Sequence, residues 1–156
     1  MAARPSLVIS ASCGHLDAID SEPGVRVMGL YERFLLPKVV DFTCSMQPNM
    51  RQRAKVVPLA WGSVLEVGFG SGLNLPFYDG SKVQHVWALD PSTEMWAIAE
   101  GRVRGTAFPV EFLKAPAEQI PLADESADTV LVTYTLCTLR DVRRALGEMA
   151  RLLKPG

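Results

Sequence analysis

Histidine and cysteine are scarce in this chain, and their scarcity excludes several kinds of site. The 156 residues include two histidines and three cysteines. Neither His15 nor His85 has a Cys, Asp or Glu at metal-ligand spacing, so no metal site is expected. The cysteines are odd in number and far apart, which argues against a disulfide framework and indicates free thiols. The reducing compartment that such thiols favour is the cytoplasm.

Net charge and long apolar runs are also lacking. The chain balances 16 basic against 17 acidic side chains, for a net charge of −1. This balance gives no electrostatic reason to expect a nucleic-acid partner or a membrane surface. No apolar run reaches the roughly 18–20 residues that span a bilayer, so no stable membrane span is expected. With 48% hydrophobic residues, the composition is that of a globular domain with its own core.

The first third of the chain divides into an arm and a helical segment. Residues 1–24 mix Ser, Pro, Gly and Asp without a period, which predicts a flexible N-terminal arm. Residues 25–60 carry apolar side chains at helical spacing and predict a helical cover. Within it, Tyr31 could lie against a ligand or simply pack on the sheet. A second helical piece follows Pro48, and its buried stripe would consist of Met50, Ala54 and Val57.

At the centre of the sequence, a short apolar segment is followed by three alternate glycines. Residues 61–67 have the apolar and β-branched character of a buried strand. Gly68, Gly70 and Gly72 then allow positive φ angles and the close approach of a ligand to the backbone. Asn74 is expected to cap a short helical turn. A strand, a glycine turn and a helix start are typical of nucleotide sites, although a tight turn without a ligand remains the alternative.

The glycine spacing bears on which nucleotide is bound. A dinucleotide fingerprint would need its third glycine where Leu73 stands, so the NAD hypothesis is weakened. The next predicted strand runs from Val83 to Asp90, and an acid at its end can accept hydrogen bonds from both hydroxyls of an adenosine ribose. Asp90 could instead cap the following helix, but Ser92 is better placed for that role.

Two further strands and two helices complete an alternating α/β pattern. The strands are expected at residues 109–113 and 128–133, and the helices at residues 93–102 and 140–153. The last helix is amphipathic, with Val142, Ala145, Leu146 and Met149 on its apolar side. Strands that alternate with helices in this way predict a doubly wound parallel sheet.

Five segments together resemble the class I S-adenosylmethionine-dependent methyltransferases. They are Glu66 with the glycine loop, Asp90, the Ala117-Glu118 pair, the strand that begins at Asp128, and the Leu-Lys-Pro-Gly ending. Within that family the chain is most similar to the small-molecule branch, which holds ubiquinone- and menaquinone-type and thiol methyltransferases. The resemblance implies a Rossmann-like, mostly parallel sheet with a visible strand order 3-2-1-4. It also implies an incomplete domain over residues 25–156, with a core at 61–156 that stops before strands 5–7.

The resemblance assigns S-adenosyl-L-methionine as the cofactor and places its parts. Glu66 and the glycine loop would hold the methionine end, Asp90 the ribose, and Met95 with Ala117-Glu118 the adenine, although Met95 could equally be a core residue. The reaction would take place beside Thr133, Tyr134 and Cys137, and Cys137 itself is expected to be a buried thiol. The full set of implied cofactor-binding residues is Glu66, Gly68, Phe69, Gly70, Gly72, Asn74, Asp90, Pro91, Met95, Ala117, Glu118 and Thr133. No catalytic base is named, because a thiolate or an activated carbon needs none.

These observations predict a methyltransferase that acts on a small-molecule methyl acceptor, with its activity impaired by the short chain. The exposed edge of the fourth strand would also be a site for self-association. Two alternatives remain open from the sequence. One is a non-catalytic, methyltransferase-like binding module, and the other is an NAD-dependent oxidoreductase.

Overall fold

The computed structural model describes residues 6–10, 45 and 47–156 of the chain. The predicted helix within residues 25–44, with Tyr31, lies outside the described residues. The elements, in chain order, are β1 (Ser6–Ser10), α3 (Gln47–Val56), η2 (Val57–Leu59), β2 (Gly62–Val67), η3 (Leu75–Phe77), β3 (Val83–Leu89), α4 (Thr93–Val103), β4 (Val110–Leu113), β5 (Thr129–Thr133), η4 (Leu136–Thr138) and α5 (Val142–Leu152).

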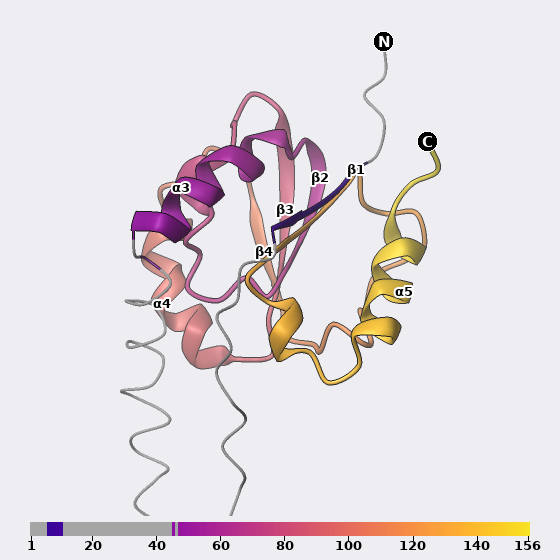
Figure 1. The fold of residues 1–156 in the computed structure, drawn as a ribbon. Helices are drawn as coiled ribbons and strands as arrows, with labels where there is room; N and C mark the ends of the chain where they lie inside the picture. The colour runs from indigo at the N-terminus through magenta and orange to yellow at the C-terminus, as the bar shows by residue number, and fades with distance from the viewer. Residues whose placement is uncertain (1–5, 11–44, 46) are drawn as a thin grey trace, which may run out of the picture.

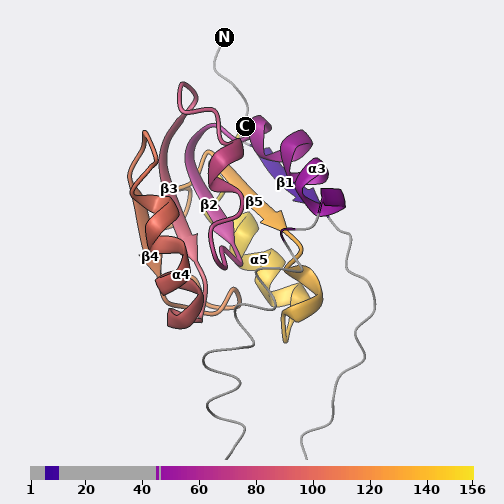
Figure 2. The same ribbon diagram turned by 90° about the vertical axis from the view of Figure 1, so that its left-hand side faces the viewer.

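The five strands form one parallel sheet in the order β1-β5-β2-β3-β4, which Figure 2 shows across its width. The order of β4, β3, β2 and β5 is the predicted 3-2-1-4 arrangement, so this prediction is confirmed. Both faces of a parallel sheet are usually apolar, so such a sheet is stable when helices cover both of them. All five residues of β5 are buried, as the nearly continuous apolar character of this segment predicts.

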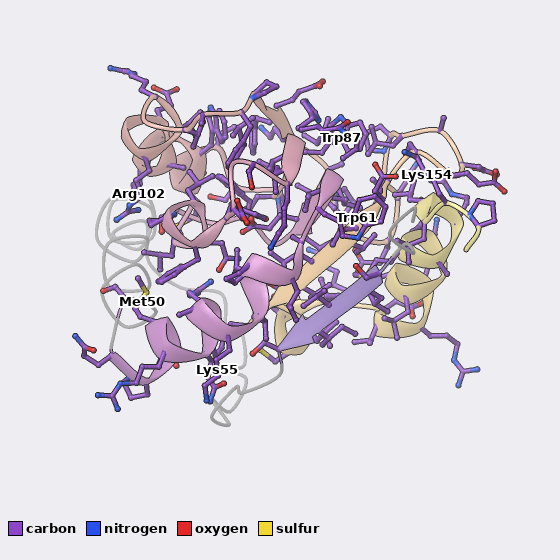
Figure 3. The ribbon with its side chains drawn as sticks, turned by 90° about the horizontal axis from the view of Figure 1, so that it is seen from above. Met50, Lys55, Trp61, Trp87, Arg102 and Lys154 are labelled. Carbon is purple, nitrogen blue, oxygen red and sulfur yellow. The ribbon has the colours of Figure 1, made fainter. Side chains whose placement is uncertain are left out.

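Helices cover the two faces of the sheet and enclose two separate cores. Helices α3 and α4 lie on one face and α5 lies on the other (Figure 1). The first core includes Val57, after α3, and Ala99, of α4. The second core includes Ala145 and Met149 of α5. Figure 3 shows α3 near β1, with the exposed side chain of Lys55 pointing away from the sheet.

The N-terminal segment departs from the prediction of a flexible arm, because residues 6–10 form a strand. β1 pairs in parallel with β5, so that Val8 stands opposite Leu131 and Ser10 opposite Thr133. The edge of β5, which the sequence predicts to be exposed, is therefore paired, and β1 is the outer strand. The Val8 side chain packs into the first core, whereas Leu7 and Ile9 point to the other side of the sheet and are exposed.

Several helix ends are close to their predicted positions. Ser92 caps α4, as predicted, by accepting the N–H of Met95 at 3.1 Å. Asn74 stands at the N-cap position of η3, as predicted, but its side chain makes no capping hydrogen bond and bonds the side chains of Glu66 and Thr133 instead. In α5, Val142 and Leu146 were expected on the apolar side but are exposed. Among the described residues, the helices are all too short or too polar to cross a membrane.

Candidate functional site

A cavity of about 620 Å³ lies where the strands end at their carboxyl edge. Its volume falls in the range typical of small-molecule sites. The lining residues come from α3, the glycine loop, the segments after β3 and β4, and the end of β5. They are Arg53, Val67, Gly68, Phe69, Gly70, Ser71, Leu73, Leu89, Asp90, Pro91, Ser92, Met95, Ala115, Pro116, Ala117, Glu118, Thr133, Tyr134, Thr135, Thr138, Leu139 and Arg140.

The glycine loop bends over the end of β3 and exposes its backbone to the cavity. The N–H groups of Gly68 and Phe69 both donate to the Leu89 carbonyl, at 2.9 and 3.1 Å. Gly68 has φ of +72° and a Cβ there would overlap the Thr135 side chain, so only glycine fits this position. Gly70 has φ of +57°, and the Met95 side chain lies 3.5 Å from the place a Cβ would occupy. The loop therefore leaves its main chain open to a ligand.

Asp90 ties this loop to the helix that follows β3. One carboxylate oxygen accepts the N–H of Gly70 at 2.8 Å, and the other accepts the N–H of Ser92 at 2.8 Å. Burial raises the pKa of Asp90 from its usual value, although these two backbone hydrogen bonds act in the opposite direction. A carboxylate has about four lone-pair sites, so two remain for further donors such as the hydroxyls of a ribose. The residue fits an adenosine ligand.

A buried hydrogen-bond network lies behind the glycine loop and is centred on Glu66. Its carboxylate accepts the Tyr78 hydroxyl at 2.6 Å and the Asn74 amide at 2.8 Å. Glu66 is only 1% exposed. Burial raises its pKa to about 7, against the lowering effects of Tyr78, Asn74 and the Arg53 charge. Burial and the neighbouring Glu66 also raise the pKa of Tyr78. This carboxyl group therefore titrates near neutral pH.

Arg53 connects α3 to this network and also lines the cavity. One guanidinium nitrogen donates to Asn74 Oδ1 at 2.7 Å and to Thr133 Oγ1 at 3.1 Å. The guanidinium carbon lies 4.9 Å from the centre of the Tyr134 ring, a cation–π distance. The residue is 6% exposed. A buried cation at this position influences every charged group bound nearby.

Tyr134 follows β5 in a strained backbone conformation with φ of +58°. Its hydroxyl lies 3.4 Å from the carbonyl of Asn49 in α3, and its N–H donates to the Ser10 carbonyl of β1 at 3.3 Å. Non-glycine residues with positive φ persist only where their surroundings hold them, and they are concentrated at functional sites. The contacts from α3 and β1 hold Tyr134 in this way.

Met95, Ala117 and Glu118 also line the cavity. The Glu118 carboxylate accepts the N–H groups of Arg140 and Asp141, at 3.0 and 3.1 Å. These hydrogen bonds connect the segment after β4 to the start of α5, and together with the Arg140 charge they lower the pKa of Glu118. Glu118 thus has a positioning role that the sequence did not indicate, and its predicted contact with an adenine stays a prediction.

The structure brings nine of the twelve predicted residues to the cavity, and Glu66, Gly72 and Asn74 lie behind its lining. Phe69 is 3% exposed, and its ring packs against Trp96 at 5.9 Å, so its side chain is a core residue. Cys137 was expected to be buried, but it is exposed. Arg53 was missed entirely. Among the described residues, no group of His, Cys, Asp and Glu side chains has the arrangement of a metal site.

Comparison with known proteins gives a consistent family. The model of the methyltransferase domain matches residues 65–156. A phosphatidylethanolamine N-methyltransferase from Cereibacter sphaeroides is 36% identical over 68% of this chain and 52% of its own length. For a thiol S-methyltransferase from Homo sapiens, the identity is 35% over 60% of this chain and 39% of the relative. The chain thus spans about half or less of these relatives.

A ubiquinone/menaquinone biosynthesis C-methyltransferase from Rubrivivax gelatinosus is 34% identical over 64% of this chain and 38% of its own length. Among solved structures, a SAM-dependent methyltransferase from Aquifex aeolicus matches with a TM-score of 0.62 and 29% identity, over 76% of this chain and 68% of that one. One chain of a complex between a methyltransferase and its activator from Haloferax volcanii matches with a TM-score of 0.65 and 26% identity. The match covers 85% of this chain and 58% of that one.

Proposed function

Because the chain belongs to the class I S-adenosylmethionine-dependent methyltransferases, we propose that it binds this cofactor at the carboxyl edge of the sheet and methylates a small molecule there. The cofactor supplies a methyl group on a sulfonium, which is already activated towards nucleophiles. The residues of the chain must therefore bind, orient and exclude water. The family match decides against the NAD-dependent alternative that the sequence left open.

Asp90 carries this proposal within the structure. Its two remaining lone-pair positions would accept the ribose hydroxyls, while its hydrogen bond to Gly70 holds the loop that would receive the methionine end. Met95 and Ala117, which both line the cavity, would contact the adenine. Glu66 and Asn74 would not contact the cofactor directly, because both lie behind the lining of the cavity. They would act on the ligand through Arg53 and Thr133, which reach the cavity.

The acceptor that suits this site is one that is already nucleophilic, such as a thiolate or an activated carbon. The described lining contains no His or Lys, and its carboxylates are those of Asp90 and Glu118. Backbone N–H groups engage both carboxylates: the pKa of Glu118 is lowered, and Asp90, whose pKa burial raises, holds the glycine loop and would be occupied by the ribose. A neutral amine or alcohol would have to lose a proton during transfer, and this lining offers no base for it.

Titration calorimetry with the cofactor, S-adenosylhomocysteine and NADH tests the binding site. We expect micromolar-range binding of the first two and none of NADH. Methyl transfer to a small thiol, a hydroquinone and a primary amine then tests the acceptor. Transfer to the thiol or hydroquinone supports the proposal, whereas transfer to the amine alone contradicts the acceptor class. A folded chain that binds neither adenosyl ligand would contradict the proposed function itself.

A further inference from the structure

We propose that Arg53 is a positioning residue of this cavity: from α3 it supplies, through Asn74, the counter-charge to the buried Glu66 carboxylate, and it thereby sets the affinity for a ligand that carries a sulfonium. The inference rests on the proposed function, because it concerns the same cofactor. It adds a residue outside the glycine loop, and it predicts how the affinity depends on pH.

The contacts of Asn74 make it the link between the two charges. Its side-chain nitrogen donates to Glu66 at 2.8 Å, and its side-chain oxygen accepts from Arg53 at 2.7 Å. Because the amide has one donor end and one acceptor end, this arrangement suits a carboxylate on one side and a cation on the other. Asn74 is 0% exposed, so water does not screen the pair from each other at that point.

The remaining groups around Glu66 define its charge balance. Tyr78 donates to its second oxygen, and Asp90, at the end of β3, adds a repulsive negative charge. Thr133, from β5, accepts from both Asn74 and Arg53, at 2.9 and 3.1 Å. Arg53 is the one positive charge that acts on Glu66 among the described residues. Removing Arg53 should therefore raise the pKa of Glu66 further, because burial and the repulsion from Asp90 would be less opposed.

The charge of Glu66 matters for the proposed cofactor because the buried Glu66 carboxylate lies behind the lining of the cavity in which the cofactor would bind. S-adenosylmethionine has a net charge of about +1 near neutral pH, whereas S-adenosylhomocysteine lacks the sulfonium and is close to neutral. An ionised Glu66 attracts the former, and the attraction is lost when the carboxyl group is protonated. Since burial, opposed by Tyr78, Asn74 and Arg53, brings the pKa of Glu66 to about 7, the affinity for the sulfonium ligand should rise with pH across the neutral range.

The test measures the affinity of the protein for both ligands by calorimetry from pH 5.5 to about pH 8.5, in a range that brackets the raised pKa of Glu66. For the unchanged protein, we expect the affinity for S-adenosylmethionine to rise by about tenfold, with a much smaller change for S-adenosylhomocysteine. Arg53→Gln should move the midpoint of the rise upward by about one pH unit. Arg53→Lys keeps the charge and should leave the midpoint close to its original place. Glu66→Gln should flatten the profile.

A purely structural role for Arg53 gives a different result. Affinity would then fall by the same factor at every pH and for both ligands, with an unchanged midpoint, and this outcome overturns the inference. A flat profile for the unchanged protein overturns it as well while leaving the proposed function intact. Absence of binding at every pH overturns both. Circular dichroism shows whether each variant folds, and if Arg53→Gln does not, Glu66→Gln alone still decides, because a pH dependence that survives it contradicts the inference.

Discussion

The carboxylate of Asp90 accepts the N–H of Gly70 at 2.8 Å, so the residue that follows β3 also holds the loop that follows β2. Strands β2 and β3 are neighbours in the sheet, and their carboxyl ends meet at one edge of it. A single side chain therefore shapes the loop and offers its remaining lone pairs to a ligand. Loss of this side chain should affect ligand binding more than folding.

Replacing Asp90 with alanine tests this expectation. We expect the affinity for S-adenosylmethionine to fall by at least roughly tenfold, because hydrogen bonds to a charged group contribute about 1.5–3 kcal/mol each. The matched control is Asp79→Ala. Asp79 also accepts backbone and side-chain bonds, from Ser81, but it precedes β3 at the opposite edge of the sheet. Calorimetry that finds equal losses in the two variants would contradict a specific role for Asp90.

Gly68→Ala should destabilise the fold by about 1–3 kcal/mol, the usual cost of forcing extra volume into a packed site. The added methyl group would meet the Thr135 side chain, and the positive φ adds strain. Urea denaturation measures the loss, and Thr135→Ala in the same chain should recover part of it. Gly147→Ala in α5 is the control. Nothing lies within 4 Å of its added methyl group, and alanine favours the helix, so stability should rise slightly.

The buried Glu66 should make the free energy of unfolding fall as the pH rises from about 4.5 to about 7. Its pKa is about 7 in the folded protein and near 4.5 when unfolded, so the folded state holds a proton that the unfolded state has lost. The contribution is complete below pH 4.5 and disappears above pH 7, with a full size of about 3 kcal/mol.

Urea denaturation of the unchanged protein and of Glu66→Gln across this range provides the check. The raised pKa of Asp90 acts in the same direction in both proteins, so the difference between the two curves reports Glu66. The lowered pKa values of Asp79 and Glu148, each about 2, concern a lower pH range. Parallel curves for the two proteins would show that Glu66 titrates as an ordinary surface carboxyl.

Glu118→Ala should loosen the start of α5 without unfolding the sheet. The carboxylate accepts the N–H groups of Arg140 and Asp141, and this segment forms part of the cavity wall. We expect faster hydrogen exchange of those two amides and a weaker affinity for any adenosyl ligand. If the carboxylate instead contacts the adenine, Glu118→Ala will change the preference between adenosine and inosine analogues while exchange stays as it was.

The central strands could be predicted from the sequence because each signal is local. β2, β3 and β5 are apolar and β-branched runs, and a glycine turn follows β2 and an acid follows β3. Their order was implied by the resemblance to the methyltransferase family. Ser92 was recognisable as a cap from its position ahead of α4. Of the nine predicted residues that line the cavity, Gly68, Gly70 and Asp90 fit the rule that ligands bind beyond the carboxyl ends of such strands, and the others were implied by the family resemblance.

Arg53 and β1 could not be predicted in the same way, because their burial depends on distant partners. The other basic residues of α3, Arg51 and Lys55, are exposed. Arg53 is buried because it contacts the segment after the glycine loop, at Asn74, and β5, at Thr133. One local signal existed: Arg53 precedes the buried Val57 by four residues and so shares its side of the helix, whereas the predicted Ala54 is exposed. β1 has only Leu7-Val8-Ile9 as its apolar signal, and its partner β5 lies near the other end of the sequence.

A pair of substitutions in β1 tests whether this strand supports the cavity. Val8 is 9% exposed and packs into the first core, whereas Ile9 is 40% exposed on the other side of the strand. Val8→Asp should lower the free energy of unfolding by about 2–4 kcal/mol, because it places an unpaired charge in the core, and Ile9→Asp by less than about 1 kcal/mol. Since the Ser10 carbonyl accepts the N–H of Tyr134, Val8→Asp should also weaken ligand binding. Equal stabilities of the two variants would mean that residues 6–10 are not seated against β5 in solution.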